Sequence, residues 1–596
     1  MTGYDAPIDE MRFVLDEVTM LPEIARLPGG EQATPDLVGA VLEEAGKLAR
    51  DVLAPLNASG DRERSRLENG VVRTPTGFRE AYRRYVEGGW NALPFAPEHG
   101  GQGLPIALST AVLEMWNAAN LSFALCPILT VGAVELLAAH GSPRQQRLYL
   151  EKLVSGEWTG TMNLTEPQAG SDLGALTTRA VREGDHYRIT GQKIFITYGD
   201  HDLAENIVHM VLARTPEAPP GTKGISLFIV PKFLPREDGG PGERNDLRPV
   251  SLEHKLGIHA SPTCVMAYGD NGGAIGDLVG EENRGIEYMF TMMNNARLNV
   301  GLQGVAIAER AYQQASSFAR QRVQGRPIGA AGTAALPILH HPDIRRMLLM
   351  MKALTEATRA LAYFAAGAID RARHHPDAAT REEQQRLVDL LIPIVKAWST
   401  DRGVETASIG IQIHGGMGFI EETGAAQHLR DARITPIYEG TNGIQANDLL
   451  GRKVMRDGGE TARRFIETMR ALDGALAAEA LDAFPAMRAR LGAALDALSE
   501  ATAWIVARWP ADPALTIAGA VPYLELFGTA AGGWLMAKAA LAAAARLRQR
   551  KGDPDFNRAK IATARFYAEH ILPRTAGLLP AVFGGGAVLD FPLERL

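Results

Sequence analysis

The order of apolar and polar positions divides the chain into helical and β stretches. Over residues 34–158 apolar residues recur at helical spacing, with Val38, Val41, Leu42 and Ala45 on one face. About five or six helices fit into this stretch. A shorter amphipathic segment and a Pro-Gly-Gly loop precede it. We expect these first residues to form an arm that docks on the main body.

The apolar period changes near residue 160 and changes back near residue 285. Short β-rich runs between turn clusters predict strands at 187–197, 207–212, 225–230 and 263–268. After residue 285 the helical period returns in three long segments, 286–322, 343–373 and 382–412. The stretch from about residue 458 to the end is Ala-rich and helical, with a break at 510–513.

This succession predicts an α+β architecture with helical and β domains packed against one another, because no low-complexity linker separates them. We expect an N-terminal arm at 1–33, an N-terminal helical domain at 34–159, a middle β-barrel domain at 160–280, a helical bundle at 281–455 and an additional C-terminal helical domain at 456–596. No repeat of fixed period indicates a solenoid.

Composition excludes several functional classes. The 596 residues carry 62 Lys and Arg against 69 Asp and Glu, a net charge of −7, which provides no general attraction to nucleic acid or to an anionic membrane. The acidic start lacks the features of a secretory signal, and we expect no apolar run long enough to span a bilayer, so the sequence predicts a cytoplasmic protein. Cys126 and Cys264 are too few for a disulfide framework or a cysteine-based metal site and indicate buried free thiols.

One turn near the end of the helical bundle presents a single carboxylate, Glu439, ahead of a new helix. Pro436 and Gly440 oppose continuation of the preceding helix. Thr441 or Asn442 is suited to cap the helix that follows. A Glu in a Gly-rich turn is usually a solvated surface residue, so the surrounding sequence must decide its role.

Four further segments place this turn in a family. They are 162–172 (MNLTEPQAGSD), 255–264 (KLGIHASPTC), 412–419 (QIHGGMGF) and the pair Arg430 and Asp431. In order and spacing, together with the Tyr438-Glu-Gly-Thr turn, they resemble the acyl-CoA dehydrogenases over roughly residues 34 to 450. The resemblance also matches the helix, β, helix division of that family.

The resemblance implies an FAD-dependent enzyme that oxidises an acyl-CoA thioester to the trans-2-enoyl-CoA. Because no amino-acid side chain accepts a hydride, this chemistry needs a flavin. By resemblance, Glu439 removes the α-proton while the β-hydride passes to flavin N5, and Arg297 lies beside the base. In some branches the base instead precedes that Arg, but Ala296 occupies the position here. Glu439 is therefore the base among the family's two options.

The family also implies the residues that contact the flavin and the thioester. Phe195 occupies a position often held by Trp, the loop at Arg322 is one residue shorter than usual, and Gly443 offers only backbone. The implied flavin contacts are Leu164, Thr165, Gly170, Ser171, Phe195, Thr197, Arg322, Gln412, Gly415, Gly416, Thr441 and Gly443. The implied acyl-CoA contacts are Ser171, Asn294, Arg297, Tyr438 and Gly440.

The chain continues for nearly 150 residues beyond the catalytic turn, where ordinary members of the family end. It thus resembles the extended bacterial acyl-CoA dehydrogenases, among them the 3-methylmercaptopropionyl-CoA dehydrogenases. This implies an acyl-CoA substrate such as 3-(methylthio)propanoyl-CoA or a short or medium fatty acyl-CoA, and electron-transfer flavoprotein as the acceptor. In such long forms the extra domain covers surface that a second dimer covers in shorter relatives, so we expect a homodimer.

Two other functions remain open on the sequence. An alkylation-response flavoprotein of the AidB type, proposed to bind DNA, shares the fold, and residues 546–574 carry eight Arg or Lys against three Asp or Glu. Helical basic stretches are more often solvated faces, however, and the chain as a whole is acidic, so we expect no nucleic-acid partner. An acyl-CoA oxidase would share Glu439 and FAD and differ in how the reduced flavin meets oxygen.

Overall fold

The computed structural model describes residues 3–236, 238–329 and 334–596. The chain forms two compact units. The β unit comprises Glu44–Leu104 and Met115–Ala296, and the helical unit comprises Met1–Glu43, Pro105–Glu114 and Arg297–Leu596. Each is described by itself.

The β unit combines helices with a curled eight-stranded sheet and two separate two-stranded sheets. Helices occupy most of residues 34–158, as the spacing of apolar residues predicted. One of them, α7, has apolar residues on every side and is buried along most of its length. The elements before the sheet are α3 (Pro35–Leu48, whose first part belongs to the helical unit), η2 (Ala49–Leu53), α4 (Pro55–Glu63), β1 (Arg66–Glu68), β2 (Val71–Arg73), α5 (Phe78–Glu87), η3 (Trp90–Ala92), η4 (Pro97–His99), α6 (Ile106–Ala119, which begins in the helical unit), α7 (Leu121–His140) and α8 (Pro143–Ser155).

The sheet contains eight strands in the order β10-β11-β5-β12-β7-β6-β3, with β4 paired to β5. All pairs are antiparallel except β3 with β6. The four predicted strands are present as β5, β6, β7 and β11. The strands and short helices of this part of the chain are β3 (Trp158–Asn163), η5 (Leu173–Ala175), β4 (Arg179–Glu183), β5 (His186–Thr197), β6 (Asn206–Ala213), η6 (Thr222–Gly224), β7 (Ser226–Pro231), β8 (Phe233–Pro235), β9 (Pro241–Arg244), β10 (Leu247–Leu252), β11 (Thr263–Tyr268) and β12 (Ala274–Leu278). Of these, β8 and β9 pair with each other in a two-stranded sheet of their own, as β1 and β2 do.

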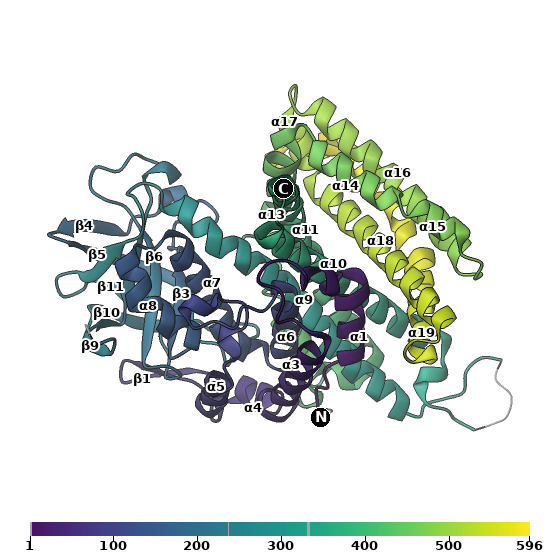
Figure 1. The fold of residues 1–596 in the computed structure, drawn as a ribbon, viewed down its shortest axis with the longest axis horizontal. Coiled ribbons are helices and arrows are strands. Elements are labelled where there is room, and N and C mark those ends of the chain that lie inside the picture. Colours follow the sequence, from purple (N-terminus) through teal and green to yellow (C-terminus); the bar gives the residue numbers. More distant parts are fainter. Residues whose placement is uncertain (1–2, 237, 330–333) are drawn as a thin grey trace. The chain divides into compact units, whose positions relative to one another are not determined.

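The helical unit contains the three long helices that the sequence predicts and, after them, the additional C-terminal helices (Figure 1). Its elements are α1 (Ile8–Phe13), η1 (Val14–Val18), α2 (Leu21–Ile24), α9 (Gly285–Gln321, whose first turns belong to the β unit), η7 (Ile338–His340), α10 (Pro342–His374), α11 (Ala378–His414), η8 (Gly415–Phe419), η9 (Glu421–Thr423), α12 (Ala425–Ala432), α13 (Asn442–Asp448), η10 (Leu449–Val454), η11 (Met455–Asp457), α14 (Glu460–Arg470), α15 (Asp473–Ala478), α16 (Phe484–Arg508), α17 (Pro513–Ala518), α18 (Ala520–Gln549), α19 (Pro554–His570), η12 (Leu572–Arg574), α20 (Thr575–Phe583), α21 (Gly585–Leu589) and η13 (Leu593–Arg595).

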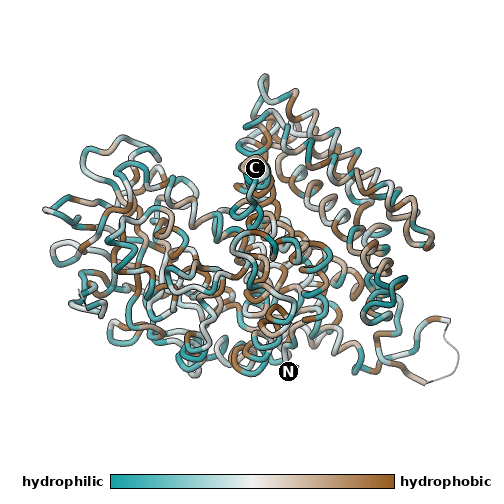
Figure 2. The backbone as a smooth tube through the Cα atoms, viewed as in Figure 1, coloured by the Kyte–Doolittle hydropathy of each residue, from teal (hydrophilic) through white to brown (hydrophobic). Residues whose placement is uncertain are grey.

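Apolar and polar residues are interspersed along the helices, as amphipathic helices require (Figure 2). The expectation that no apolar run could span a bilayer is wrong by length and composition, because α7 and α18 both pass that test. However, 89% and 83% of their apolar windows are buried inside the protein. Core helices of soluble proteins have the same property, so the two helices are weak evidence for a membrane span.

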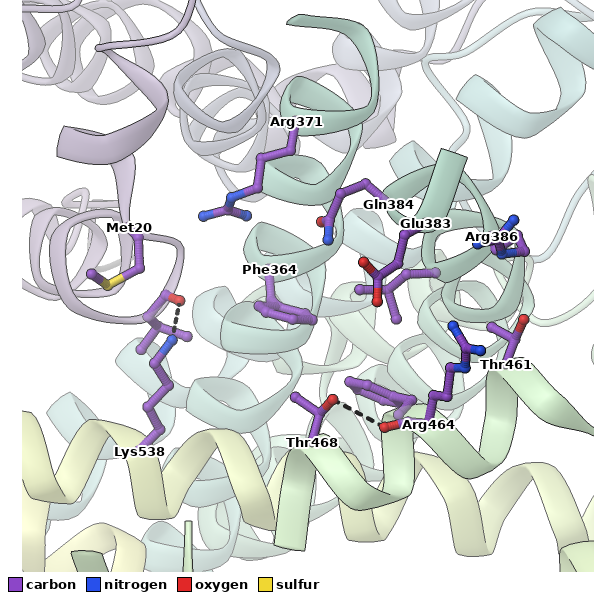
Figure 3. A pocket seen from close by; sticks show the side chains of 13 residues that line it. Met20, Phe364, Arg371, Glu383, Gln384, Arg386, Thr461, Arg464, Thr468 and Lys538 are labelled. Atoms are coloured by element: carbon purple, nitrogen blue, oxygen red, sulfur yellow. Dashed lines mark hydrogen bonds between the residues drawn. The ribbon is translucent and has the colours of Figure 1, made fainter. Parts of the chain in front are cut away.

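The N-terminal arm is held in the helical unit by cations that belong to distant parts of the chain. Lys538 of α18 donates a hydrogen bond from Nζ to the Val18 carbonyl at 3.0 Å, and Arg371 of α10 donates from Nη2 to the Thr19 carbonyl at 2.6 Å. Both cations cap the carboxyl end of η1, where helix carbonyls lack partners. They also line a cavity of about 230 Å³ with Met20 and Phe364 (Figure 3).

Candidate active site

The turn that carries Glu439 has a strained backbone. Glu439 and Gly440 both adopt left-handed conformations, with φ of 55° and 83°. For a residue with a side chain this costs on the order of 1–2 kcal/mol. Glycine suits this position because it adopts the positive φ without strain, and a Cβ atom here would also lie 2.7 Å from Nε2 of Gln445, displacing that side chain. Strain of this kind persists only where neighbouring groups hold the turn.

Hydrogen bonds from α13 hold the turn in this conformation. Gln445 donates from Nε2 to the carbonyls of Glu439 and Gly440, both at 3.2 Å. Thr441 is the N-cap of α13, accepting from the Ile444 N–H at 3.3 Å, as the sequence allowed. Gln445 is fully buried, so these bonds are shielded from competing water.

The carboxyl group of Glu439 is set for proton transfer near neutral pH. Burial raises its pKa to about 7, while the nearby Arg297 guanidinium and Lys396 ammonium oppose that rise. Within the part of the chain that the structure describes, this carboxylate accepts no hydrogen bond and forms no ion pair. A desolvated carboxylate with a pKa near 7 is suited to general-base catalysis.

Arg297, which is buried, and Tyr438, which is half-buried, belong to the same group of polar side chains as the half-buried Glu439. Arg297 of α9 donates from Nη1 to Oδ2 of Asp448 at 3.1 Å. The Tyr438 hydroxyl donates to Gln303, also on α9. Burial lowers the pKa of Arg297, while the carboxylates of Asp448 and Glu439 oppose that shift. The guanidinium therefore interacts electrostatically with both carboxylates. The structure thus brings Glu439, Arg297 and Tyr438 together.

Sequence reasoning missed Lys396, Gln445 and Asp448. Lys396 lies on α11 in the run Ile392-Pro-Ile-Val-Lys-Ala-Trp398 and is fully buried. A single cation among apolar residues was the available signal, because Lys is almost never fully buried without a partner. Its ammonium donates to the Gly440 carbonyl at 2.8 Å.

In the β unit, the predicted flavin segment around Thr165 is anchored by Glu166. Its carboxylate accepts from Nζ of Lys193 at 2.8 Å and from the Thr177 and Thr178 N–H groups at 2.7 and 3.0 Å. Burial would raise the pKa of Glu166, but the Lys193 ammonium and these hydrogen bonds lower it to about 2. A carboxylate held this way is a poor base, so Glu166 is no substitute for Glu439.

The same strand that supplies Lys193 also carries the predicted ring contact Phe195. The Ile194 N–H donates to the Thr165 carbonyl at 2.9 Å, which places Leu164 and Thr165 beside this part of β5. Phe195 adopts a left-handed φ of 59° and is 58% exposed. An aromatic residue that is both exposed and strained marks a binding surface more often than a core.

In the helical unit, the predicted contacts Arg322 and Gln412 are both exposed. Arg322 directly follows α9, and Gln412 lies near the end of α11. The two helix ends lie close together, because the ring centroids of Phe318 and His414 are 4.4 Å apart. Gly415 and Gly416 follow directly, and a Cβ atom at either position would meet open space.

The other residues predicted to contact the flavin or the acyl-CoA belong partly to the β unit and partly to the helical unit. Ser171, Gly170 and Asn294 are exposed residues of the β unit, and Thr197 is a half-buried residue of the same unit. Thr441 and Gly443 are exposed at the start of α13 in the helical unit.

Family models match nearly the whole chain. Those described as the acyl-CoA dehydrogenase N-terminal, middle and C-terminal domains match residues 39–157, 161–270 and 283–454. A fourth, acetyl-CoA dehydrogenase C-terminal like, matches residues 462–592. The chain belongs to the acyl-CoA dehydrogenase family. The predicted α+β fold class with an extra C-terminal helical part is thereby confirmed, and so is the enzyme class.

Individual relatives align with this chain over most of their length. The chain is 52% identical to a 3-methylmercaptopropionyl-CoA dehydrogenase of Ruegeria pomeroyi, covering 96% of both chains. It is 36% identical to a butyryl-CoA dehydrogenase of Syntrophomonas wolfei, covering 94% of this chain and 93% of that one. An acyl-CoA dehydrogenase of Bacillus anthracis complexed with FAD has the same fold, with a TM-score of 0.74 at 19% identity, over 94% of this chain and 90% of that one.

Enzymes of this family use FAD, and the residues present fit it. The exposed Phe195 ring provides a flat apolar surface for a planar heterocycle. The open space over Gly170, Gly415 and Gly416 leaves backbone accessible to a bulky ligand.

The basic stretch 546–574 does not form a free cationic surface. Six of its eight cations face carboxylates within the described residues, among them Arg546 with Glu17 at 2.7 Å and Arg565 with Glu569 at 2.8 Å.

Proposed function

We propose that this enzyme dehydrogenates short acyl-CoA thioesters, 3-methylmercaptopropionyl-CoA among them, with Glu439 as the base that removes the α-proton. The observation that supports the base assignment is the desolvated carboxylate of Glu439 on a strained turn, with a pKa raised by burial to about 7. The 52% identity to the Ruegeria pomeroyi enzyme supports the substrate class.

The turn also offers hydrogen-bond donors for the thioester. Among the described residues, the backbone N–H groups of Glu439 and Gly440 donate to no acceptor. An N–H group aimed at a thioester oxygen stabilises the negative charge that develops there as the α-proton leaves, and loss of one such donor costs about 10²- to 10³-fold in rate in comparable sites. Arg297 adds a fixed positive charge beside the base. These groups make the α-proton acidic enough for a carboxylate to remove.

FAD, when bound, supplies the acceptor for the β-hydride. We assign Leu164, Thr165, Gly170, Ser171, Phe195 and Thr197 of the β unit to its binding. Arg322, Gln412, Gly415, Gly416, Thr441 and Gly443 are proposed to contact flavin across a homodimer, and their exposure in a single chain supports this. Ser171, Asn294, Tyr438 and Gly440 are assigned to the acyl-CoA, and the cytoplasm is the proposed location.

Substrate choice tests the proposal directly. The sulfur of 3-methylmercaptopropionyl-CoA stands where a fatty acyl chain has a methylene, so pentanoyl-CoA has nearly the same shape. A difference of one methylene in an apolar pocket changes kcat/KM by roughly 10- to 200-fold. We therefore expect kcat/KM to be highest for 3-methylmercaptopropionyl-CoA and pentanoyl-CoA, and to fall for butanoyl-CoA and for longer chains. A maximum at a long-chain substrate would refute the short-chain assignment.

The pH dependence tests the base. Because Glu439 must be ionised to accept a proton and burial raises its pKa to about 7, kcat/KM should rise with pH and reach half its limit near pH 7. The measurement is a kcat/KM profile for butanoyl-CoA in buffers of constant ionic strength. A profile that stays flat through neutral pH would contradict the assignment.

The electron acceptor distinguishes a dehydrogenase from an oxidase of the same fold. We propose electron-transfer flavoprotein as the acceptor. After anaerobic reduction by butanoyl-CoA, the enzyme should be reoxidised rapidly by this acceptor and slowly by air, as followed by visible absorbance. Faster reoxidation by oxygen, with stoichiometric peroxide, would favour the oxidase.

A further inference from the structure

Lys396 is the one lysine of the described residues that lies directly against the Glu439 turn. It is fully buried on α11, and burial lowers its pKa to about 7, while Glu439 and Asp401 counteract this shift and Arg297 adds to it. Burying an ammonium group costs several kcal/mol unless other groups compensate. Such a cost calls for a function beyond packing.

The ammonium connects the turn to the long helix α11. Nζ donates to the Gly440 carbonyl at 2.8 Å and to Oδ1 of Asn442 at 2.9 Å. Asn442 in turn donates from Nδ2 to Oδ1 of Asp401 at 2.8 Å and to the Ala397 carbonyl at 3.1 Å. Both ends of the turn after Glu439 are therefore attached to one rigid helix.

Hydrogen bonds alone do not require a charge at this position. A neutral donor would satisfy the Gly440 carbonyl without the cost of a buried cation. No carboxylate lies within ion-pair distance of Nζ in the described ranges, so the charge of Lys396 is not neutralised by a direct partner. In a poorly solvated site such a charge acts over several ångströms, and Glu439 is the carboxylate it influences most.

We propose that Lys396 is a positioning residue for the base: it holds the left-handed turn through Gly440 and Asn442, and in its protonated form its positive charge stabilises the ionised carboxylate of Glu439. This inference rests on the proposed role of Glu439. Other charged groups nearby modulate the same equilibrium. Arg297 acts electrostatically on Glu439, and Asp448 and Arg452 act on Arg297. Asp401 is influenced by Arg402, Lys396 and Arg433.

The sign of the effect follows from electrostatics. Removing a positive charge near a carboxylate makes its ionised form less stable, so the pKa of Glu439 must rise. The rising limb of the kcat/KM profile should then move to higher pH. If the limb moves up by about one pH unit, kcat/KM falls roughly 10-fold at pH values below the pKa of Glu439, and its high-pH limit stays largely unchanged.

Two variants separate the charge from the hydrogen bonds. Lys396→Gln keeps a neutral donor, one bond shorter than lysine, whereas Lys396→Met removes donor and charge. We expect the rising limb of the kcat/KM profile to move to higher pH in both variants. Only Lys396→Met should also have a lower kcat/KM at all pH values. FAD content and melting temperature report folding, and if Lys396→Met does not fold, Lys396→Gln decides. A limb unmoved in a folded Lys396→Gln enzyme overturns the proposal.

A second readout follows proton removal without oxidation. Acetyl-CoA has α-hydrogens but no β-carbon, so it can exchange hydrogen with D₂O and cannot be dehydrogenated. Mass spectrometry should show the same pH shift for exchange in Lys396→Gln. Glu439→Gln serves as the comparator. If Glu439→Gln still exchanges at the parental rate, the base assignment fails; if it does not exchange while Lys396→Gln shows a parental profile, only the role of Lys396 fails.

Discussion

Replacing Glu439 by Gln should reduce turnover by at least the 10²- to 10⁴-fold that a general base typically contributes. The amide has nearly the size of the carboxylate but cannot accept a proton from carbon. The position beside Arg297 offers no alternative acid, because it is Ala296. Thr441 and Gln445 are unchanged, so FAD content and acyl-CoA affinity should remain close to those of the parent. Stopped-flow reduction of the enzyme by butanoyl-CoA measures the effect.

The matched control is Glu422→Gln, which makes the same chemical change at an exposed Glu of the helical unit. This variant should reduce its flavin at the parental rate. If Glu439→Gln also did so, Glu439 would not be the base. Glu166 would be an unsuitable alternative base, because its carboxylate is kept ionised by Lys193 and already accepts hydrogen bonds from two backbone N–H groups.

Replacing Lys560 by Met should destabilise the protein by about 3–5 kcal/mol, the usual cost of removing one partner from a buried ion pair. Lys560 of α19 donates to Oε1 of Glu10 at 2.6 Å and to Oε2 of Glu356 at 2.8 Å. It therefore connects the N-terminal arm and α10 to the additional C-terminal helices. Burial would raise the pKa of Glu356, but Lys352 and Lys560 outweigh it and lower that pKa. Without Lys560 the charge on Glu356 is compensated by Lys352 alone, and Glu10 loses its partner.

The control for this variant is Arg565→Met on the same helix, where the pair with Glu569 is solvent-exposed. Exposed pairs contribute about 0–1 kcal/mol, so its melting temperature should stay near that of the parent. Thermal unfolding followed by circular dichroism compares the three proteins. Equal melting temperatures for Lys560→Met and the parent would show that the arm and the extra helices are held by packing rather than by this cluster.

Much of the fold was predictable because period and composition are local properties. The three long helices appear within a few residues of their predicted ends, and the predicted runs at 187–197 and 263–268 are strands β5 and β11. Both cysteines are buried free thiols, as expected. The sequence predicted five or six helices over residues 34–158 but did not single out α7, whose apolar stretch is long enough to span a membrane by length and composition and is 89% buried inside the protein.

The sequence by itself determined the family, the FAD-dependent chemistry and Glu439 as the candidate base, because five short segments in fixed order carry that information. The tertiary structure alone decided which charges act on the base. Lys396 is 43 positions from Glu439 in the sequence, and nothing local indicates that its ammonium reaches the carbonyl of Gly440. The same holds for Glu166, whose Lys193 partner turns a candidate base into an anchor. Electrostatic environment depends on distance and burial in three dimensions, and these emerge only when helices and strands pack.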